Sequence, residues 1–157
     1  MKVMLNRFSL FFSILVLAGP LYAADRAPEE YLQDLNSDDP LVQMEACRML
    51  GRGEVSAAVG PLINLMQSSG DERVQAHAAA ALGAIGEAGP STEAILRLLD
   101  SSDSASVQYA GIAALANLDD SDRKSQILAA IEKVEQDTSD RLVQDLAMRL
   151  KPIVQGQ

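Results

Sequence analysis

The fold is decided by one stretch of the chain, residues 71–83, which read DERVQAHAAAALG. Its Val-Gln pair occurs four times, at residues 42–43, 74–75, 107–108 and 143–144, so successive copies are 32, 33 and 36 residues apart. A period of this size is typical of stacked supersecondary units, none of which buries its apolar face alone. The sequence therefore predicts a solenoid, an architecture that presents surface and seldom carries out chemistry.

The residues around each valine repeat with the spacing of an α-helix. Positions 0, +4, +7 and +8 from the valine share one side of a helix and are expected to form a buried stripe. Position +4 holds Ala46, Ala78, Gly111 and Ala147, and position +8 holds Leu50, Leu82, Leu115 and Lys151. The fourth copy fits least well, because Leu142, Leu146 and Leu150 offer it a second register.

Each of these helices has a predicted start and end. The residue three before the valine is Asp or Ser, which can cap a helix by accepting hydrogen bonds from its first amides. These residues are Asp39, Asp71, Ser104 and Asp140. Pro40 follows Asp39 at the first helical position, where its missing N–H has no partner to lose. Gly51, Gly83 and Gly86 lie at or near the helix ends.

A second set of helices is predicted between the valine-centred ones from the spacing of apolar residues. Its members are residues 28–36, 56–67, 91–100 and 122–136. Turn-forming residues separate all the segments, and none shows sustained β alternation. The predicted fold is an all-α solenoid of about four antiparallel helix pairs. Its units are residues 28–52, 54–86, 90–118 and 121–153.

The frame Asp-x-x-Val-Gln-x-x-Ala-x-x-Ala-Leu-Gly at residues 71–83 resembles the short HEAT-like repeat of phycobilisome lyases. The resemblance covers about residues 28–153 and implies that the second helix of each pair lines the concave face. In that family the residue after the valine is commonly arginine, which ladders with the aspartate at position −3. Here it is always glutamine, so we expect an amide ladder in place of a charged one: Gln43, Gln75, Gln108 and Gln144.

The first 23 residues have the order of a secretory signal peptide. Lys2 and Arg7 precede an apolar run at residues 8–17, and Gly19-Pro20 precedes a small residue, Ala23. A retained membrane anchor is the rival interpretation, but the run is shorter than the ~20 residues that span a bilayer. We therefore expect cleavage after Ala23, a single mature domain at residues 24–157 without membrane insertion, and a periplasmic or secreted location.

The charge of the chain limits the kinds of molecule that it is expected to bind. The chain carries 22 acidic and 13 basic residues, a net charge of −9, and two of the basic residues fall in the predicted signal peptide. An acidic surface repels nucleic acid and anionic lipid, so protein is the expected partner.

The outward positions of the second helices are expected near +2, +5, +6 and +9, and they are unusually apolar. One interpretation is tight packing between neighbouring helices. The other is an apolar strip that binds a partner. The candidate partner-binding residues are Met44, Cys47, Arg48, Tyr109, Ile112, Met148 and Arg149.

The residue types that usually carry chemistry are sparse. The lone cysteine, Cys47, is expected to be a small buried hydrophobe, or else a thiol that forms an intermolecular disulfide or reacts by redox chemistry. His77, the lone histidine, is expected to be structural at the flank of the core. No zinc site is expected, because the chain has too few histidine and cysteine ligands. The acidic stretch 119–122 is expected to serve helix capping and solubility, and would be the first place to seek weak cation binding.

The motifs that mark catalysis were not found in the sequence, and no cofactor or metal is expected. The predicted function is therefore a non-enzymatic adaptor or scaffold of the cell envelope that binds another protein through its second-helix surface. One alternative is a structural protein that associates with further copies of itself. The other is a chromophore-handling, lyase-type protein, against which the predicted signal peptide argues because those lyases act in the cytoplasm.

Overall fold

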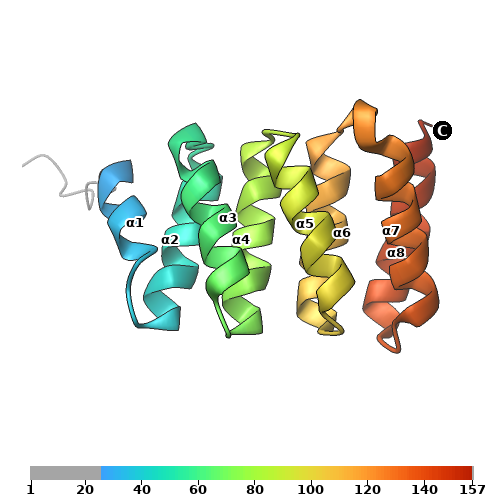
Figure 1. Cartoon of the computed structure of the whole chain (residues 1–157), viewed down its shortest axis with the longest axis horizontal. Coiled ribbons are helices and arrows are strands. Elements are labelled where there is room, and N and C mark those ends of the chain that lie inside the picture. The colour runs from blue at the N-terminus through green and yellow to red at the C-terminus, as the bar shows by residue number, and fades with distance from the viewer. Residues whose placement is uncertain (1–25, 157) are drawn as a thin grey trace, which may run out of the picture.

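The computed structural model describes residues 26–156, which form eight α-helices, two short 3-10 turns and no strand. The helices are α1 (Pro28–Asp34), α2 (Pro40–Arg52), α3 (Val59–Ser68), α4 (Glu72–Ile85), α5 (Pro90–Ser101), α6 (Ala105–Leu118), α7 (Lys124–Asp137) and α8 (Arg141–Gln155). Figure 1 shows the helix pairs in a row, with α3, α5 and α7 in front of α4, α6 and α8 and α1 at the N-terminal end beside α2. The predicted all-α solenoid is confirmed, whereas the predicted signal peptide lies outside the described residues.

The first helix of each pair lies where apolar spacing predicts it. The turns η1 (Ser56–Ala58) and η2 (Ser121–Arg123) lead into α3 and α7 and account for the early starts predicted for these two helices. Helix α1 has 7 residues, whereas α3, α5 and α7 have 10, 12 and 14. Helix α1 therefore covers α2 over only part of its length.

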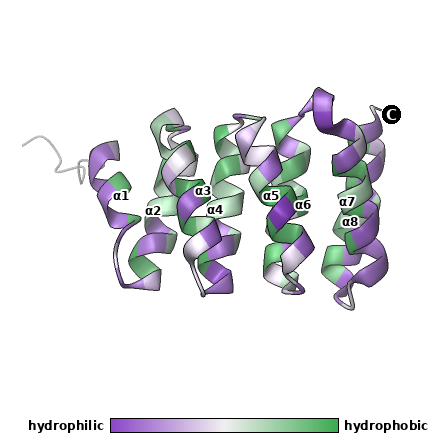
Figure 2. Ribbon diagram, in the orientation of Figure 1, coloured by the Kyte–Doolittle hydropathy of each residue, from purple (hydrophilic) through white to green (hydrophobic). Residues whose placement is uncertain are grey.

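The buried stripe of the second helices is confirmed except at Val42, Met49, Leu150 and Lys151, which are half-buried. Val74, Val107 and Val143 are buried, and every small residue at +4 and every leucine at +8 is buried with them. In Figure 2 the hydrophobic colour accordingly dominates α4 and α6. Val143 is buried and Leu142 is exposed, so the alternative register of the fourth repeat is wrong.

The loop inside each helix pair is built the same way in all four repeats. A hydroxyl five residues before the valine accepts a hydrogen bond from the backbone N–H of the residue at −3. Ser37, Ser69, Ser102 and Thr138 accept in this way at 3.1, 3.1, 3.3 and 3.2 Å. The periodic hydroxyl therefore shapes the turn that places each capping residue.

Three of the four predicted caps are confirmed. The carboxylates of Asp39 and Asp71 each accept from an amide of the first turn, and that of Asp140 accepts from two. Ser104 stands at the cap position without this bond, because its hydroxyl lies 3.0 Å from that of Ser106. The prediction of a side-chain cap at Ser104 is wrong.

The glutamines bond within their own repeats. Gln43 Nε2 donates to the backbone oxygen of Ser37 at 2.7 Å, and Gln75 Nε2 donates to that of Ser69 at 2.8 Å. Gln108 is buried and Gln144 is exposed. The first two amides therefore close the loop of their own helix pair, where the sequence predicts a ladder between repeats.

Substitutions at two of the cap positions test which residues cap the second helices. Asp140→Ala is expected to lower the free energy of unfolding by about 1 kcal/mol, because two amides of α8 lose their acceptor. Ser104→Ala removes a side chain that caps nothing and should leave stability nearly unchanged. Urea denaturation followed by circular dichroism measures both, and equal losses would contradict the assignment of the caps.

Glycines bring the second helices into backbone contact. A methyl group built on Gly83 would lie 2.6 Å from Ala114 Cα, and one built on Gly51 would lie 2.9 Å from Ala81 Cα. Both glycines lie near their helix ends as predicted, but their role is close packing. Gly86, in contrast, ends α4 in the left-handed conformation at φ 76°. Helices α2, α4 and α6 therefore form a tightly packed layer.

The junction with the fourth repeat is built differently. Ala116 stands on α6 where α2 and α4 have their packing glycines, and Lys151 stands on α8 where the other second helices have leucine. Lys151 forms an ion pair with Glu135 of α7. The last repeat therefore meets α6 without a packing glycine and holds a polar pair between its own two helices. None of the helices between residues 26 and 156 is long and apolar enough to cross a membrane.

Candidate functional site

The side chains that point outward from the second-helix layer occupy three positions in each repeat, at −1, +6 and +10 from the valine. These positions fall within about 40° of one another at the 3.6-residue period of a helix. All are exposed except Ala113, which is half-buried. We call these twelve residues the second-helix face: Leu41, Arg48, Arg52, Arg73, Ala80, Ala84, Ser106, Ala113, Asn117, Leu142, Arg149 and Ile153.

Two candidate residues point elsewhere. Cys47 and Ile112, both at position +5, are 0% exposed, so the prediction that +5 faces outward is wrong for them. Each second helix packs against its layer neighbours as well as its own first helix, and the stripe that includes +5 lies against the following second helix. Met148 holds the same position on α8, the last second helix of the described residues, and is 49% exposed.

The other candidates lie at or beside the second-helix face. Arg48 and Arg149 belong to it, and each forms an ion pair with an acidic residue of its own helix, Glu45 and Asp145 respectively. Tyr109, at position +2 on the flank, is 48% exposed, and Met44 at the same position of α2 is half-buried. The structure thus brings Arg48, Arg149 and Tyr109 to one surface and leaves Met148 at the end of the array.

Three exposed apolar residues of the face are missing from the candidates. Leu41 and Leu142 hold position −1 in the first and last repeats, and Ile153 holds position +10 of the last. Counting outward positions from the buried valine would have found them. All five large hydrophobic residues exposed between residues 26 and 156 belong to second helices: Leu41, Tyr109, Leu142, Met148 and Ile153.

Charge is also unevenly distributed. None of the twelve residues of the face is Asp or Glu, and four are arginine, in a chain with 22 acidic residues. The nearest carboxylates are Glu45, Asp71 and Asp145, which stand beside the face and pair with Arg48, Arg73 and Arg149. The face is therefore apolar and basic in a protein that is acidic overall.

A pocket of about 360 Å³ adjoins the face at the N-terminal end of the array. It lies where the short α1 leaves the end of α2 uncovered, and apolar side chains such as Tyr31, Met49 and Val55 line it together with Arg26 and Arg52. Because Arg52 also belongs to the second-helix face, the pocket forms a recess at one edge of that face.

The buried Cys47 is a small hydrophobe, as one of the two interpretations predicts. Burial raises the pKa of its thiol to about 12, so the thiol stays protonated at neutral pH. Because this pKa is raised in the folded chain, the contribution of Cys47 to the free energy of unfolding is fully present below pH 9 and is lost as the pH rises toward 12.

The thiol of Cys47 is therefore expected to resist modification in the folded protein. A thiol-exchange reagent at pH 8 should react slowly with the native chain and within its ordinary reaction time with the urea-unfolded chain. Absorbance of the released reagent anion measures both rates. Equal rates would show that Cys47 is accessible in the native state.

His77 is exposed on α4, whereas the sequence predicts it at the flank of the core. Its Nδ1 is 2.8 Å from the backbone oxygen of Arg73 one turn earlier. The ring is therefore engaged by the helix on which it stands.

Within the acidic stretch 119–122, Asp120 is buried and bonded to neighbouring segments. Burial raises the pKa of Asp120, but the backbone N–H of Gly89 and the guanidinium of Arg123 outweigh burial and lower it overall. Gly89 and Arg123 donate hydrogen bonds to its carboxylate at 3.1 and 3.2 Å, whereas the Thr92 hydroxyl does not reach hydrogen-bond geometry. Asp120 thus ties the start of α5 to the turn before α7. Across residues 26–156, no group of three His, Cys, Asp or Glu residues is arranged to hold a metal ion.

Comparison with known proteins agrees with this architecture. The family model of HEAT repeats matches residues 28–116, which includes the first three helix pairs up to the last turn of α6. No curated protein matches the chain. Because the family model covers more than half of the sequence, the chain belongs to the HEAT-repeat family.

Proposed function

We propose that this HEAT-repeat protein is a non-enzymatic scaffold of the cell envelope that binds another protein through its second-helix face. HEAT repeats generally mediate protein–protein interaction. The observation that carries the proposal is that all five exposed large hydrophobic residues of the described chain stand on second helices. All five therefore stand in one layer of the solenoid, and tyrosine, methionine and arginine are favoured at interfaces.

Affinity capture tests this proposal. The tagged chain is incubated with an extract of its own source, in parallel with the variant Tyr109→Asp/Leu142→Asp. Both side chains are well exposed, so the variant should keep its helical content by circular dichroism. Proteins captured by the wild type and lost by the variant support the proposal. Identical captured sets would place the function outside this face.

The envelope location rests on the signal-peptide pattern of residues 1–23. We expect the exported protein to begin at Ala24, which mass spectrometry of the chain purified from its own source will test. An intact N-terminus in the cytosolic fraction would overturn this part of the proposal without affecting the binding surface.

Self-association through α8 is a second candidate. Met148 is exposed at the position where every other second helix packs against the next one. A second copy that covers this edge would continue the layer, and head-to-tail contacts of this kind extend into open assemblies. Light scattering over a range of concentrations, with Met148→Glu as the matched variant, distinguishes this candidate from a monomer.

A further inference from the structure

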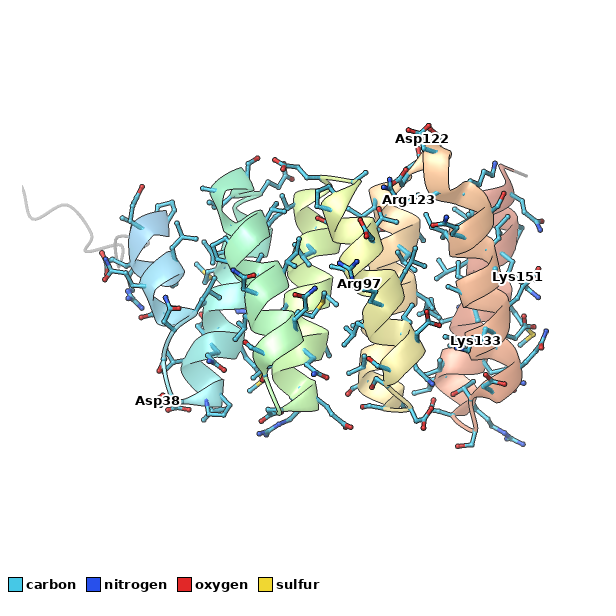
Figure 3. All side chains as sticks on the ribbon, in the orientation of Figure 1. Asp38, Arg97, Asp122, Arg123, Lys133 and Lys151 are labelled. Atoms are coloured by element: carbon cyan, nitrogen blue, oxygen red, sulfur yellow. The ribbon has the colours of Figure 1, made fainter. Side chains whose placement is uncertain are left out.

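Charge is sorted between the two layers of the solenoid. The second helices contain six basic and three acidic residues: Arg48, Arg52, Arg73, Arg141, Arg149 and Lys151 against Glu45, Glu72 and Asp145. The rest of the described chain contains five basic and eighteen acidic residues. The strong negative charge therefore belongs to the first helices and the loops. Figure 3 places Arg97 and Lys133, two of the basic residues outside the second helices, on α5 and α7 in the front layer.

The arginines of the second-helix face are available to an incoming carboxylate. Arg48, Arg73 and Arg149 form ion pairs with acidic residues close in sequence, but their side chains remain 51%, 64% and 73% exposed. Exposed pairs of this kind contribute little to stability and exchange partners readily. Arg52 forms no ion pair with any residue between 26 and 156. Guanidinium groups bind carboxylates through two parallel hydrogen bonds, which gives such contacts direction.

Exposed apolar side chains stand in the same layer as these arginines, on α2, α6 and α8. Leu41 stands beside Arg48 and Arg52 on α2, and Leu142 and Ile153 stand beside Arg149 on α8, with Tyr109 on α6 between them. A ligand that satisfies the face must bring carboxylates and apolar side chains together. Nucleic acid and anionic lipid headgroups would meet the arginines with phosphate, but neither brings apolar side chains to Leu41, Tyr109 and Leu142.

We infer that the partner bound at the second-helix face is an acidic, amphipathic protein segment, whose carboxylates pair with Arg48, Arg73 and Arg149 while its apolar side chains cover Leu41, Tyr109 and Leu142. This inference rests on the proposed function and adds the chemistry of the partner to it. Such a segment is attracted to the basic face and repelled by the first-helix layer, so electrostatics selects the layer to which it docks.

The test uses a random-peptide display library selected on the purified chain. Peptides enriched in Asp and Glu together with apolar residues are the expected result. Binding of a selected synthetic peptide should weaken roughly tenfold or more in Arg48→Glu/Arg149→Glu and should fall as salt is raised toward about 0.15 M. Arg97→Glu is the matched control, because Arg97 is equally exposed on α5 and also pairs with an acidic residue one turn away.

The outcomes separate the two proposals. Selected peptides that are apolar without acidic residues, or that bind Arg48→Glu/Arg149→Glu as tightly as the wild type, would overturn the acidic partner and leave the binding face in place. Selection that is unaffected by Tyr109→Asp/Leu142→Asp would overturn the binding face as well. Tighter binding of a DNA duplex or of phosphatidylglycerol vesicles than of the selected peptides, lost in the arginine variant, would assign the arginines to phosphate instead.

Discussion

Replacing Gly83 with alanine is expected to destabilise the array by about 1–3 kcal/mol, the usual range for a side chain forced into a filled core. The added methyl group would lie 2.6 Å from Ala114 Cα and 2.7 Å from its Cβ. Backbone atoms cannot move aside as a flexible side chain can, so α4 and α6 must separate. Alanine is also the better helix former by about 1 kcal/mol, and a net loss therefore means that the clash is the larger effect. Urea denaturation followed by circular dichroism measures the change.

Gly70→Ala is the control for this prediction. A methyl group there meets no atom within 4 Å, and the residue stands in the loop before α4 without a positive φ. Reducing the freedom of the unfolded chain should make this variant slightly more stable, by about 0.4–1 kcal/mol. The same substitution is thus expected to have opposite signs at two glycines. Stabilisation by Gly83→Ala would show that the second helices do not pack through backbone contact.

Ile112→Asp is expected to unfold at least the third repeat. Ile112 is among the largest fully buried side chains, and a carboxylate placed there without a partner costs about 4 kcal/mol or more even after its pKa rises. Native domains have only about 5–15 kcal/mol of stability. The expected result is loss of helical signal and a broad or absent unfolding transition in circular dichroism.

Tyr109→Asp, three residues earlier on the same helix, is the matched comparison. Its side chain is half-exposed, so the carboxylate remains in water and the unfolding transition should stay close to that of the wild type. Similar destabilisation by both substitutions would mean that the outward side of α6 has been assigned incorrectly. The pair also explains why binding variants must avoid position +5, which the sequence alone places on the surface.

The parts of the fold that depend on one helix pair could be predicted from the sequence. The buried valine, the small residue at +4, the leucine at +8 and the capping aspartates act within a single repeat, and the structure confirms them at most positions. Position +5 and the two packing glycines act between repeats. Their role depends on how closely neighbouring second helices approach, and the spacing within one helix does not contain that distance.

The candidate binding surface likewise contains some residues that one helix alone predicts and others that it does not. Arg48, Tyr109 and Arg149 could be identified because +2 and +6 lie away from the buried valine side of a helix, although Ala76 at +2 of α4 is buried against its neighbours. Leu41, Leu142 and Ile153 were missed because an apolar residue in an amphipathic helix is first interpreted as core. The loop hydroxyls at −5 also repeat in the sequence, but their acceptor role depends on the geometry of the turn.

The altered junction between α6 and α8 has a consequence for how the protein opens. In a repeat array, stability is close to a sum of terms for each repeat and each interface, and partial unfolding begins where an interface is weakest. With Ala116 in place of a packing glycine at that junction, amides of α7 and α8 should exchange hydrogen at a lower free energy than those of α2, α4 and α6. Leu142, Arg149 and Ile153 all stand on the unit that opens first. A partner seated across the face would therefore slow exchange most strongly in the last repeat, since binding only the closed form stabilises it.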